Sequence, residues 1–405
     1  MREKILLISN TFPYSGEPFL KTEMDFLPER QFVYVWPFFA DQSKEARCMI
    51  TPHIEAYVYS PLSVLEKMKC FIDALHVFFS EKEYKAAFAK RHSARNVIKA
   101  IKFAYISELR FTSVQAWMSR QCNQTERTLI YSYWMYETAY VAARLKTMYP
   151  DCSFITRCHG YDLYEERHPN GYLPFRSFIL KTVDMICPIS ENGKEYLKKL
   201  YGGEIEDKIQ IARLGTIRKA EIIEEQEKED SIVLVSCSNL VDVKRVHLII
   251  NALMNSRQYV HWYHFGEGEL KQKLETQAKA LPGNVKYTFM GYQANEVVQR
   301  FYADHYIDAF INVSQSEGIP VSVMEAESYG IPIIATNVGG TSEIVHDKRN
   351  GVLLDVNFTN NDLLDAINEV VEKAERYRLE ALHTWETMSN AHTVFPEFYK
   401  KLAEV

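Results

Sequence analysis

Two glutamates between residues 307 and 345 have the chemistry and the setting of ligand-binding groups. Glu317 follows an apolar, β-branched run, Ile307–Val313, which predicts a buried strand. Open α/β sheets bind ligands just beyond the carboxyl ends of their strands, so Glu317 is a candidate binding residue. Glu325 lies on a predicted helix among apolar neighbours. A carboxylate is costly to bury there unless donors satisfy it, and the hydroxyl groups of a ligand would do so.

A glycine pair and the residue after it add a second kind of chemistry. Gly339 and Gly340 let the backbone approach a ligand closely. The amides that open a predicted helix at Thr341 would suit an anion such as phosphate. Each of these features alone fits a solvated side chain or an ordinary turn. Their combination favours a binding site.

The elements that would position these residues alternate between strand and helix. Pro320 stands where a first helical residue belongs, and Gly330 ends that helix. Ile331–Ala335 predicts a second buried strand. Strand, helix and strand joined by short loops are typical of a parallel sheet, so we expect an α/β fold.

This stretch resembles the donor-sugar motif of family 4 retaining glycosyltransferases. The resemblance is carried by Glu317-Gly318-Ile319-Pro320, by Glu325-Ala326, by a Gly-Ile-Pro-Ile-Ile-Ala strand and by the glycine pair. In that family two glutamates with this spacing bracket the sugar nucleotide. The resemblance implies the GT-B fold, in which two Rossmann-like, doubly wound domains face each other across a cleft.

The N-terminal half shares two features with the same family. Phe154–Cys158 predicts a strand that leads into His159-Gly160-Tyr161-Asp162, which matches the family's motif in this domain. The match implies that His159 reaches the donor sugar. After the first predicted strand, Ile5–Ser9, a loop carries Gly16, which the resemblance makes a backbone contact for the donor phosphates. The loop has one glycine here, where the family has a pair.

The loop after the first strand of the second domain departs from the family's pattern. The family usually clamps the donor diphosphate with an arginine and, further along the loop, a lysine. Lys244 matches the lysine, but Asn239 stands at the arginine position. Asparagine keeps a hydrogen-bond donor and loses the charge and the two-pronged geometry. Either Arg245 compensates, or Lys244 and backbone amides hold the diphosphate. The base would sit near Gly291 and Tyr292.

The resemblance therefore implies a complete set of site residues. Glu317 would orient the sugar hydroxyls, Glu325 the ribose hydroxyls, and Lys244 would neutralise the leaving diphosphate. The implied catalytic residues are His159, Glu317 and Lys244, and the implied donor-binding residues are Gly16, Asn239, Arg245, Gly291, Tyr292, Gly318, Ile319, Pro320, Glu325, Gly340 and Thr341. The chain has no Asp-x-Asp motif, so we expect no catalytic metal, and no cofactor beside the nucleotide sugar, which is a substrate.

The domain organisation follows from the same features and from composition. We expect a Rossmann-like acceptor-binding domain over residues 1–215 and an acidic linker over residues 216–230, of which the run Glu221–Asp230 is predicted to be exposed. A nucleotide-sugar-binding domain would follow over residues 231–384. By resemblance, a helical tail over residues 385–405 would cross back to the first domain.

Composition excludes several classes of protein. The 405 residues are 47% hydrophobic and carry a net charge of -6, which does not favour nucleic acid as a partner. The seven cysteines include no C-x-x-C pair and fit reduced thiols. We expect no signal peptide and no membrane span, hence a cytoplasmic protein. The basic, aromatic segment 82–102 fits a contact with an anionic membrane surface, at the inner face of the cell membrane, and equally a solvated face over an aromatic core.

The implied reaction is transfer of a sugar, of hexosyl type, from a nucleotide diphosphate donor to a hydroxyl group with retention of configuration. UDP is the expected base, and the expected acceptor is a glycan or a lipid-linked glycan in capsule, exopolysaccharide or O-antigen synthesis. Two alternatives stay open. One is a glycoside hydrolase that uses Glu317 and Glu325 as acid and nucleophile. The other is a non-catalytic sugar-nucleotide-binding subunit, suggested by Asn239.

Overall fold

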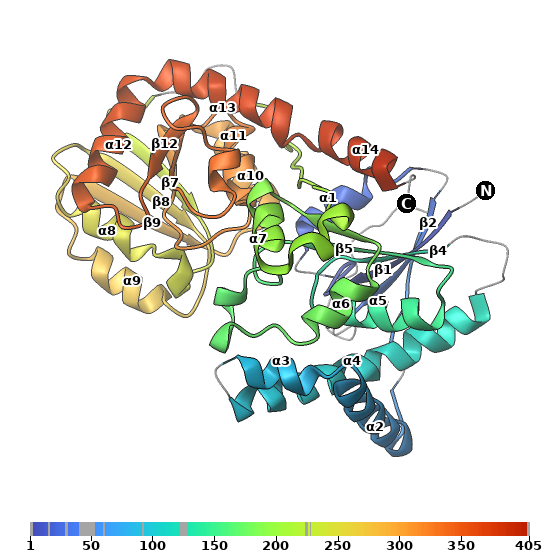
Figure 1. Ribbon diagram of the computed structural model, residues 1–405. Helices are drawn as coiled ribbons and strands as arrows, with labels where there is room; N and C mark the ends of the chain where they lie inside the picture. Colours follow the sequence, from blue (N-terminus) through green and yellow to red (C-terminus); the bar gives the residue numbers. More distant parts are fainter. Residues whose placement is uncertain are drawn as a thin grey trace. The chain divides into compact units, whose positions relative to one another are not determined.

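The computed structural model describes residues 3–14, 17–28, 31–39, 53–59, 61–90, 93–121, 128–222, 226 and 228–402. The chain divides into two compact units, which are Met1–Arg213 with Pro396–Val405 (unit 1) and Leu214–Phe395 (unit 2). A six-stranded sheet forms the centre of each unit, and Figure 1 shows both sheets with their helices.

The sheet of unit 1 has the strand order β3-β2-β1-β4-β5-β6, and every pair in it is parallel. Figure 1 shows α5 and α6 on one face of this sheet, with α4 beyond them, and α1 and α14 on the other face. The strands are β1 (Glu3–Ser9), β2 (Gln31–Pro37), β3 (Ile54–Ala56), β4 (Thr128–Ser132), β5 (Ser153–Cys158) and β6 (Met185–Pro188). The helices are α1 (Pro18–Met24), α2 (Val64–Ser80), α3 (Glu83–Ala89), α4 (Ala94–Gln121), α5 (Glu137–Met148), α6 (Arg176–Thr182), α7 (Glu191–Tyr201) and α14 (Ala391–Leu402).

The sheet of unit 2 repeats this pattern in the order β12-β11-β10-β7-β8-β9, again with parallel pairs only. Its strands are β7 (Ile232–Cys237), β8 (Val260–Phe265), β9 (Val285–Gly291), β10 (Ala309–Asn312), β11 (Ile333–Thr336) and β12 (Gly351–Leu354). Its helices are α8 (His247–Leu253), α9 (Lys271–Ala278), α10 (Asn295–Asp304), α11 (Val321–Glu327), α12 (Asn360–Glu372) and α13 (Ala374–Met388).

Both sheets have the strand order of a Rossmann fold, in which the direction of winding reverses at the centre. The reversal falls between β1 and β4 in unit 1 and between β7 and β10 in unit 2. Ligands of such sheets bind at this switch point, beyond the carboxyl ends of the strands. The predicted α/β fold with two Rossmann-like domains is therefore confirmed, and the topology selects four loops as the places to look for a site.

The structure differs from the sequence-based prediction at three places. The short strands β3 and β12 were not predicted. The helix predicted to open at Thr341 is a single 3-10 turn, Thr341–Glu343. Thr216 and Ala220, predicted to belong to the linker, are buried in unit 2, where the Ala220 amide donates to the Tyr329 hydroxyl at 3.1 Å. Among the described helices, none combines the length and the hydropathy that a bilayer span requires.

A fully buried ion pair lies in the core of unit 1. Arg157 on β5 and Glu23 on α1 are 3.0 Å apart, and neither side chain is exposed. The Tyr131 hydroxyl donates to Glu23 at 2.8 Å and accepts from Arg157 at 2.9 Å. Arg157 also donates to the Ala212 carbonyl at 2.6 Å and faces the ring of Phe398. One guanidinium thus holds both ends of unit 1 at the points where the chain leaves and re-enters it.

Removing one partner of this pair would leave the other charge buried without compensation. We expect Glu23→Ala to lower the free energy of unfolding by about 3–5 kcal/mol. On the same helix, Lys21 forms an exposed pair with Asp25, so Lys21→Ala should change it by less than about 1 kcal/mol. Equilibrium urea unfolding of the two variants measures both effects. Equal effects would contradict the assignment of Glu23 to the core.

Candidate active site

The switch point of unit 2 brings together two residues that the sequence singled out. Lys244 lies in the loop after β7, and Glu317 in the loop after β10. The Lys244 ammonium donates to the Glu317 carboxylate at 2.5 Å, and the Asn312 amide reaches the same oxygen at 3.4 Å. Burial alone would raise the pKa of Glu317, but the Lys244 charge and these hydrogen bonds outweigh it and hold the pKa below its ordinary value. Glu317 is therefore an ionised, buried carboxylate at neutral pH.

The turn at Gly339 fixes the loop that carries Glu317. Gly339 has φ +55°, and a Cβ built on it would lie 1.9 Å from the Glu317 carbonyl oxygen. Only glycine allows this approach. The Gly340 amide donates to the Gly318 carbonyl at 2.7 Å.

The helix predicted to begin beyond this turn is a single 3-10 turn, and the anion site predicted at its start stays a prediction. The Thr341 and Glu343 amides donate to carbonyls within the turn, and no helix follows whose dipole could attract a phosphate. The glycine pair therefore supports the backbone at Glu317 and Gly318. Contacts of Gly340 and Thr341 with the donor nucleotide sugar stay predictions.

Glu325 on α11 has a partner that the sequence did not reveal. The side-chain amide of Asn295, on α10, donates to its carboxylate at 2.7 Å. Burial raises the pKa of Glu325 to about 7, against the opposing effect of the Asn295 hydrogen bond. Asn295 lies 30 residues before Glu325, so no local spacing could have paired the two. The two pKa shifts are thus opposite: Glu317 is ionised at neutral pH, and Glu325 titrates near it.

Arg245, one of the two alternatives for the missing arginine, uses its guanidinium within unit 2. Its guanidinium donates to the Val313 carbonyl at 2.8 Å, to the Val356 carbonyl at 2.6 Å and to the Ser314 carbonyl at 3.4 Å. These donors hold the loop after β10 in place and are not free for a diphosphate. Asn239 is exposed. Both alternatives for binding the diphosphate stay predictions.

The remaining predicted residues of unit 2 frame this switch point. Ile319 and Pro320 are buried at the start of α11. The Gly318 carbonyl is occupied by the glycine turn described above. Gly291 ends β9 with φ +68°, and Tyr292 after it is 79% exposed. An exposed aromatic ring at the carboxyl end of a strand is suited to stack on a base.

The switch point of unit 1 is organised by Glu17, which the sequence did not single out. Its buried carboxylate accepts the backbone amides of Thr11 and Phe12, each at 2.6 Å, and the indole N–H of Trp134 at 2.6 Å. The loop after β1 is thereby tied to the residue that follows β4. Gly16, the predicted phosphate contact, lies outside the described residues.

His159 lies at the carboxyl end of β5, next to this network. Its ring centroid is 4.3 Å from that of Trp134 and 5.1 Å from that of Tyr133. Both ring nitrogens are buried, and within the described part of the chain neither has a hydrogen-bond partner. The nearest carboxylate, Asp162, is 3.7 Å away from Nδ1. Burial would raise the pKa of Asp162, but the nearby His159 ring and hydrogen bonds from the backbone amides of Met135 and His159 hold it below its ordinary value. An imidazole with unsatisfied nitrogens is suited to meet a ligand hydroxyl.

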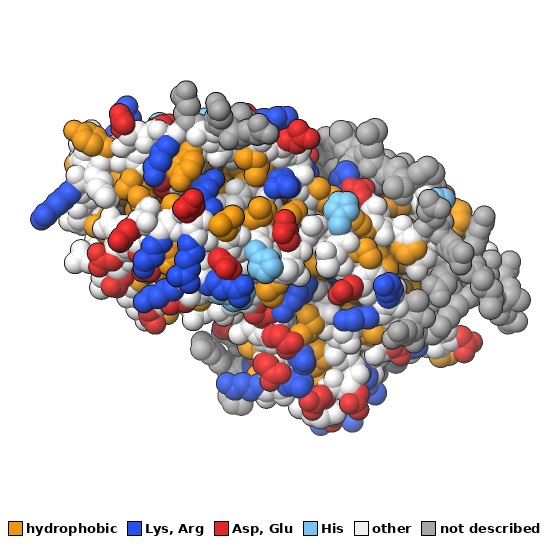
Figure 2. Space-filling view, turned by 90° about the horizontal axis from the view of Figure 1, so that it is seen from above, with side chains coloured by type: hydrophobic (Ala, Val, Ile, Leu, Met, Phe, Trp, Pro, Cys, Tyr) orange, Lys and Arg blue, Asp and Glu red, His pale blue; other side chains and the backbone are white. Residues whose placement is uncertain are grey.

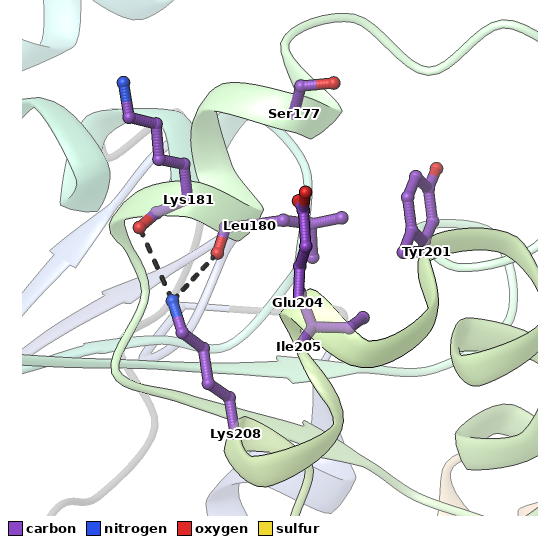
Figure 3. A pocket seen from close by; sticks show the side chains of 7 residues that line it. All are labelled: Ser177, Leu180, Lys181, Tyr201, Glu204, Ile205 and Lys208. Atoms are coloured by element: carbon purple, nitrogen blue, oxygen red, sulfur yellow. Dashed lines mark hydrogen bonds between the residues drawn. The ribbon is translucent and has the colours of Figure 1, made fainter.

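The cavity in Figure 3 lies elsewhere in unit 1. It has a volume of about 250 Å³ and is lined by the end of α6 and by Tyr201, Glu204 and Lys208. The Lys208 ammonium donates to the Leu180 and Lys181 carbonyls, in the last turn of α6. A lysine in this position caps the helix. The end of α6 leads into the amino end of β6, whereas His159 lies at the carboxyl end of β5. We therefore assign this cavity no part in the site.

Comparison with known proteins identifies unit 2. Residues 218–381 match the family model described as glycosyl transferases group 1. That range covers Lys244, Glu317 and Glu325. Unit 2 is therefore similar to the glycosyl transferases group 1 family over residues 218–381.

Curated relatives agree with this match. The O-antigen biosynthesis glycosyltransferase WbnH of Escherichia coli is 32% identical over 143 residues, which is 35% of this chain and 38% of the relative. The putative colanic acid biosynthesis glycosyltransferase WcaL of Escherichia coli strain K12 is 24% identical over 209 residues, 49% of this chain and 50% of the relative. The matches thus cover half or less of these relatives.

Solved structures share the fold over the whole chain. HepE of Anabaena in complex with UDP has a TM-score of 0.69 at 14% identity, covering 100% of both chains. The sucrose-phosphate synthase of Thermosynechococcus elongatus has a TM-score of 0.75 at 13% identity, covering 100% of this chain and 99% of that one. The predicted GT-B fold is confirmed.

The raised pKa of Glu325 has a measurable effect on stability. Below pH 4.5 the folded and unfolded states both hold its proton, and from there to about pH 7 only the folded state keeps it. This contribution to stability is therefore lost as the pH rises to about 7. Glu325→Gln cannot ionise, so its stability relative to wild type should grow by about 2–3 kcal/mol between pH 5 and pH 8. Urea unfolding at the two pH values measures this, and an unchanged difference would contradict it.

The close approach at Gly339 predicts a second effect. Gly339→Ala should lower the free energy of unfolding by at least about 1–2 kcal/mol, since its φ disfavours any side chain and the new Cβ displaces the Glu317 backbone. Gly203 is a matched control because a Cβ there meets nothing within 4 Å. Gly203→Ala should stay within about 0.5 kcal/mol of wild type. Thermal unfolding compares the two variants. If Gly339→Ala were as stable as wild type, the close approach of this turn to the Glu317 backbone would not constrain the loop.

Proposed function

We propose that the protein is a family 4 retaining glycosyltransferase that moves a hexosyl group from a nucleotide diphosphate sugar to a hydroxyl group. The proposed donor is a UDP-sugar. The proposed acceptor is a glycan or a lipid-linked glycan in capsule, exopolysaccharide or O-antigen synthesis. The observation that carries the proposal is the ionised Glu317, held by Lys244 at the switch point of a domain that is similar to the glycosyl transferases group 1 family.

Each residue has a proposed role that its chemistry supports. Departure of a nucleoside diphosphate places negative charge on the leaving oxygen, and the Lys244 ammonium is the cation positioned to neutralise it. Glu317 accepts hydrogen bonds from the sugar hydroxyls. Glu325 and Asn295 together present an acceptor and a donor to the ribose hydroxyls. His159 is the proposed contact of unit 1 with the donor sugar.

The names of relatives and neighbours support the substrate classes. Two similar proteins are named for O-antigen and colanic acid biosynthesis. HepE of Anabaena was crystallised with UDP, with UDP and glucose, and with UDP-glucose. The proposal for this chain extends to a cytoplasmic location, to a membrane contact through the basic segment 82–102 and to metal-independent transfer. Among the described residues, no group of three or more His, Cys, Asp or Glu side chains could hold a metal ion.

One observation favours a hydrolase as the second candidate. A glycosidase needs one ionised and one protonated carboxyl group, and the opposite pKa shifts of Glu317 and Glu325 provide such a pair. The hydrolase would cleave a glycoside that carries no nucleotide. A strict requirement for a nucleotide sugar, with the nucleotide as product, separates the two functions.

The proposed role of Lys244 predicts its effect on turnover. Release of nucleoside diphosphate is measured with a panel of UDP-, GDP- and ADP-sugars, with and without EDTA. Lys244→Met should lower kcat for the active donor about 100-fold or more, because the leaving charge loses its partner. Lys271 is a matched control, since it pairs with Glu267 on the surface of the same unit. Lys271→Met should leave kcat unchanged. A kcat near the wild-type value in Lys244→Met would contradict the mechanism. Loss of wild-type turnover with EDTA would also contradict it.

A further inference from the structure

Helix α2 is apolar on two different sides. Its buried residues Cys70, Ala74, Val77 and Phe78 belong to the inward side, and α2 packs against α3 and α4. Figure 1 shows α2 farther from the sheet of unit 1 than α4. The inward side accounts for the helix as a structural element of unit 1.

The second side of α2 is exposed to solvent. Leu65 is 78% exposed, Met68 57%, Ile72 62% and Phe79 61%. At about 100° per residue these side chains, with Val64 and Phe71, fall within an arc of about 120°. Ordinary surface positions carry isolated apolar side chains, whereas a continuous stripe of them marks an interaction surface. We call this stripe the α2 apolar face.

At the same 100° per residue, Lys67 and Lys69 fall just outside the two borders of the α2 apolar face, and the segment around it is basic. Residues 61–121 contain 11 Lys and Arg and five Asp and Glu, a net charge of +6 in a chain of net charge -6. Two of the five acids, Glu83 and Glu108, are buried. On α2 itself, Lys67 and Lys69 are both exposed. The rest of the chain therefore carries a net charge of -12, by subtraction of +6 from -6.

The α2 apolar face adds to the membrane contact proposed for segment 82–102. Within that segment the Lys90 ammonium pairs with Glu165, and Lys99 donates to the Tyr172 carbonyl at 2.8 Å. Part of the basic set is thus used inside unit 1. The exposed apolar side chains lie mainly on α2, which precedes the segment.

We propose that the α2 apolar face inserts into the surface of an anionic lipid bilayer, with the surrounding lysines and arginines on the headgroups. An apolar stripe bordered by bases is the pattern of a helix that lies in the membrane interface. A second copy of this chain fits the face less well, because symmetric pairing would bring two basic surfaces together. The face over α13 in Figure 2 shows the contrast, with acidic and basic side chains mixed and hydrophobic ones scattered.

Co-sedimentation with lipid vesicles tests this proposal on the full chain without any donor or acceptor, so its outcome is independent of the transferase proposal. Vesicles of phosphatidylcholine are compared with vesicles in which a third of the lipid is phosphatidylglycerol. Wild type should bind only the anionic vesicles and release them at high salt. Leu65→Ser/Ile72→Ser should weaken binding at least about tenfold, and Lys67→Gln/Lys69→Gln about tenfold.

Leu379, on α13, is 69% exposed and supplies the matched control. Leu379→Ser should bind vesicles like wild type. Because every substituted side chain is exposed, all variants should unfold at the wild-type temperature. The proposal is overturned if wild type ignores anionic vesicles, or if both α2 variants bind like wild type. It is also overturned if sedimentation velocity shows a wild-type dimer that Leu65→Ser/Ile72→Ser converts to monomer, because a second copy would then cover the face.

Discussion

The ion pair between Lys244 and Glu317 is the interaction on which the account of this protein rests. Glu317 is buried, and a buried carboxylate without a partner would take up a proton. The Lys244 ammonium keeps it ionised, and the glycine turn at Gly339 fixes the backbone beneath it. Substrate would therefore meet a preorganised acceptor and a cation in one place, with little reorganisation left for the reaction itself.

Topology explains why the pair exists. Each sheet reverses its winding at the centre, so two loops that are distant in sequence leave neighbouring strands side by side. In unit 2 these loops carry Lys244 and Glu317. In unit 1 these loops are the one after β1 and the one after β4, which contains Trp134. Glu17 joins the two loops by hydrogen bonds, next to His159. The same strand order thus produces one polar site in each unit, and the two sites differ only in the residues at the strand ends.

The sequence predicted the features that depend on local patterns. Buried parallel strands are continuous apolar runs, so β1, β7 and β10 could be read directly. Features that depend on distant partners could not be predicted. Asn295 meets Glu325 only because α10 packs on α11, and Arg245 is committed to carbonyls 68 and 111 residues away. The Thr-Ser-Glu run after the glycine pair has the composition of a helix start. It remains one turn because Asn350 accepts the His346 amide and bends the chain back.

The measurement that tests the central claim most directly is UDP binding by titration calorimetry at pH 6 and pH 8, with wild type and Glu325→Gln. If the ionised carboxylate receives the ribose hydroxyls, binding to wild type should strengthen about tenfold between these pH values, in proportion to the ionised fraction of a group with a pKa of about 7. Glu325→Gln should show only the change that UDP's own phosphate contributes. The same pH dependence in both proteins, or no binding of UDP by wild type, would contradict a nucleotide site at this switch point.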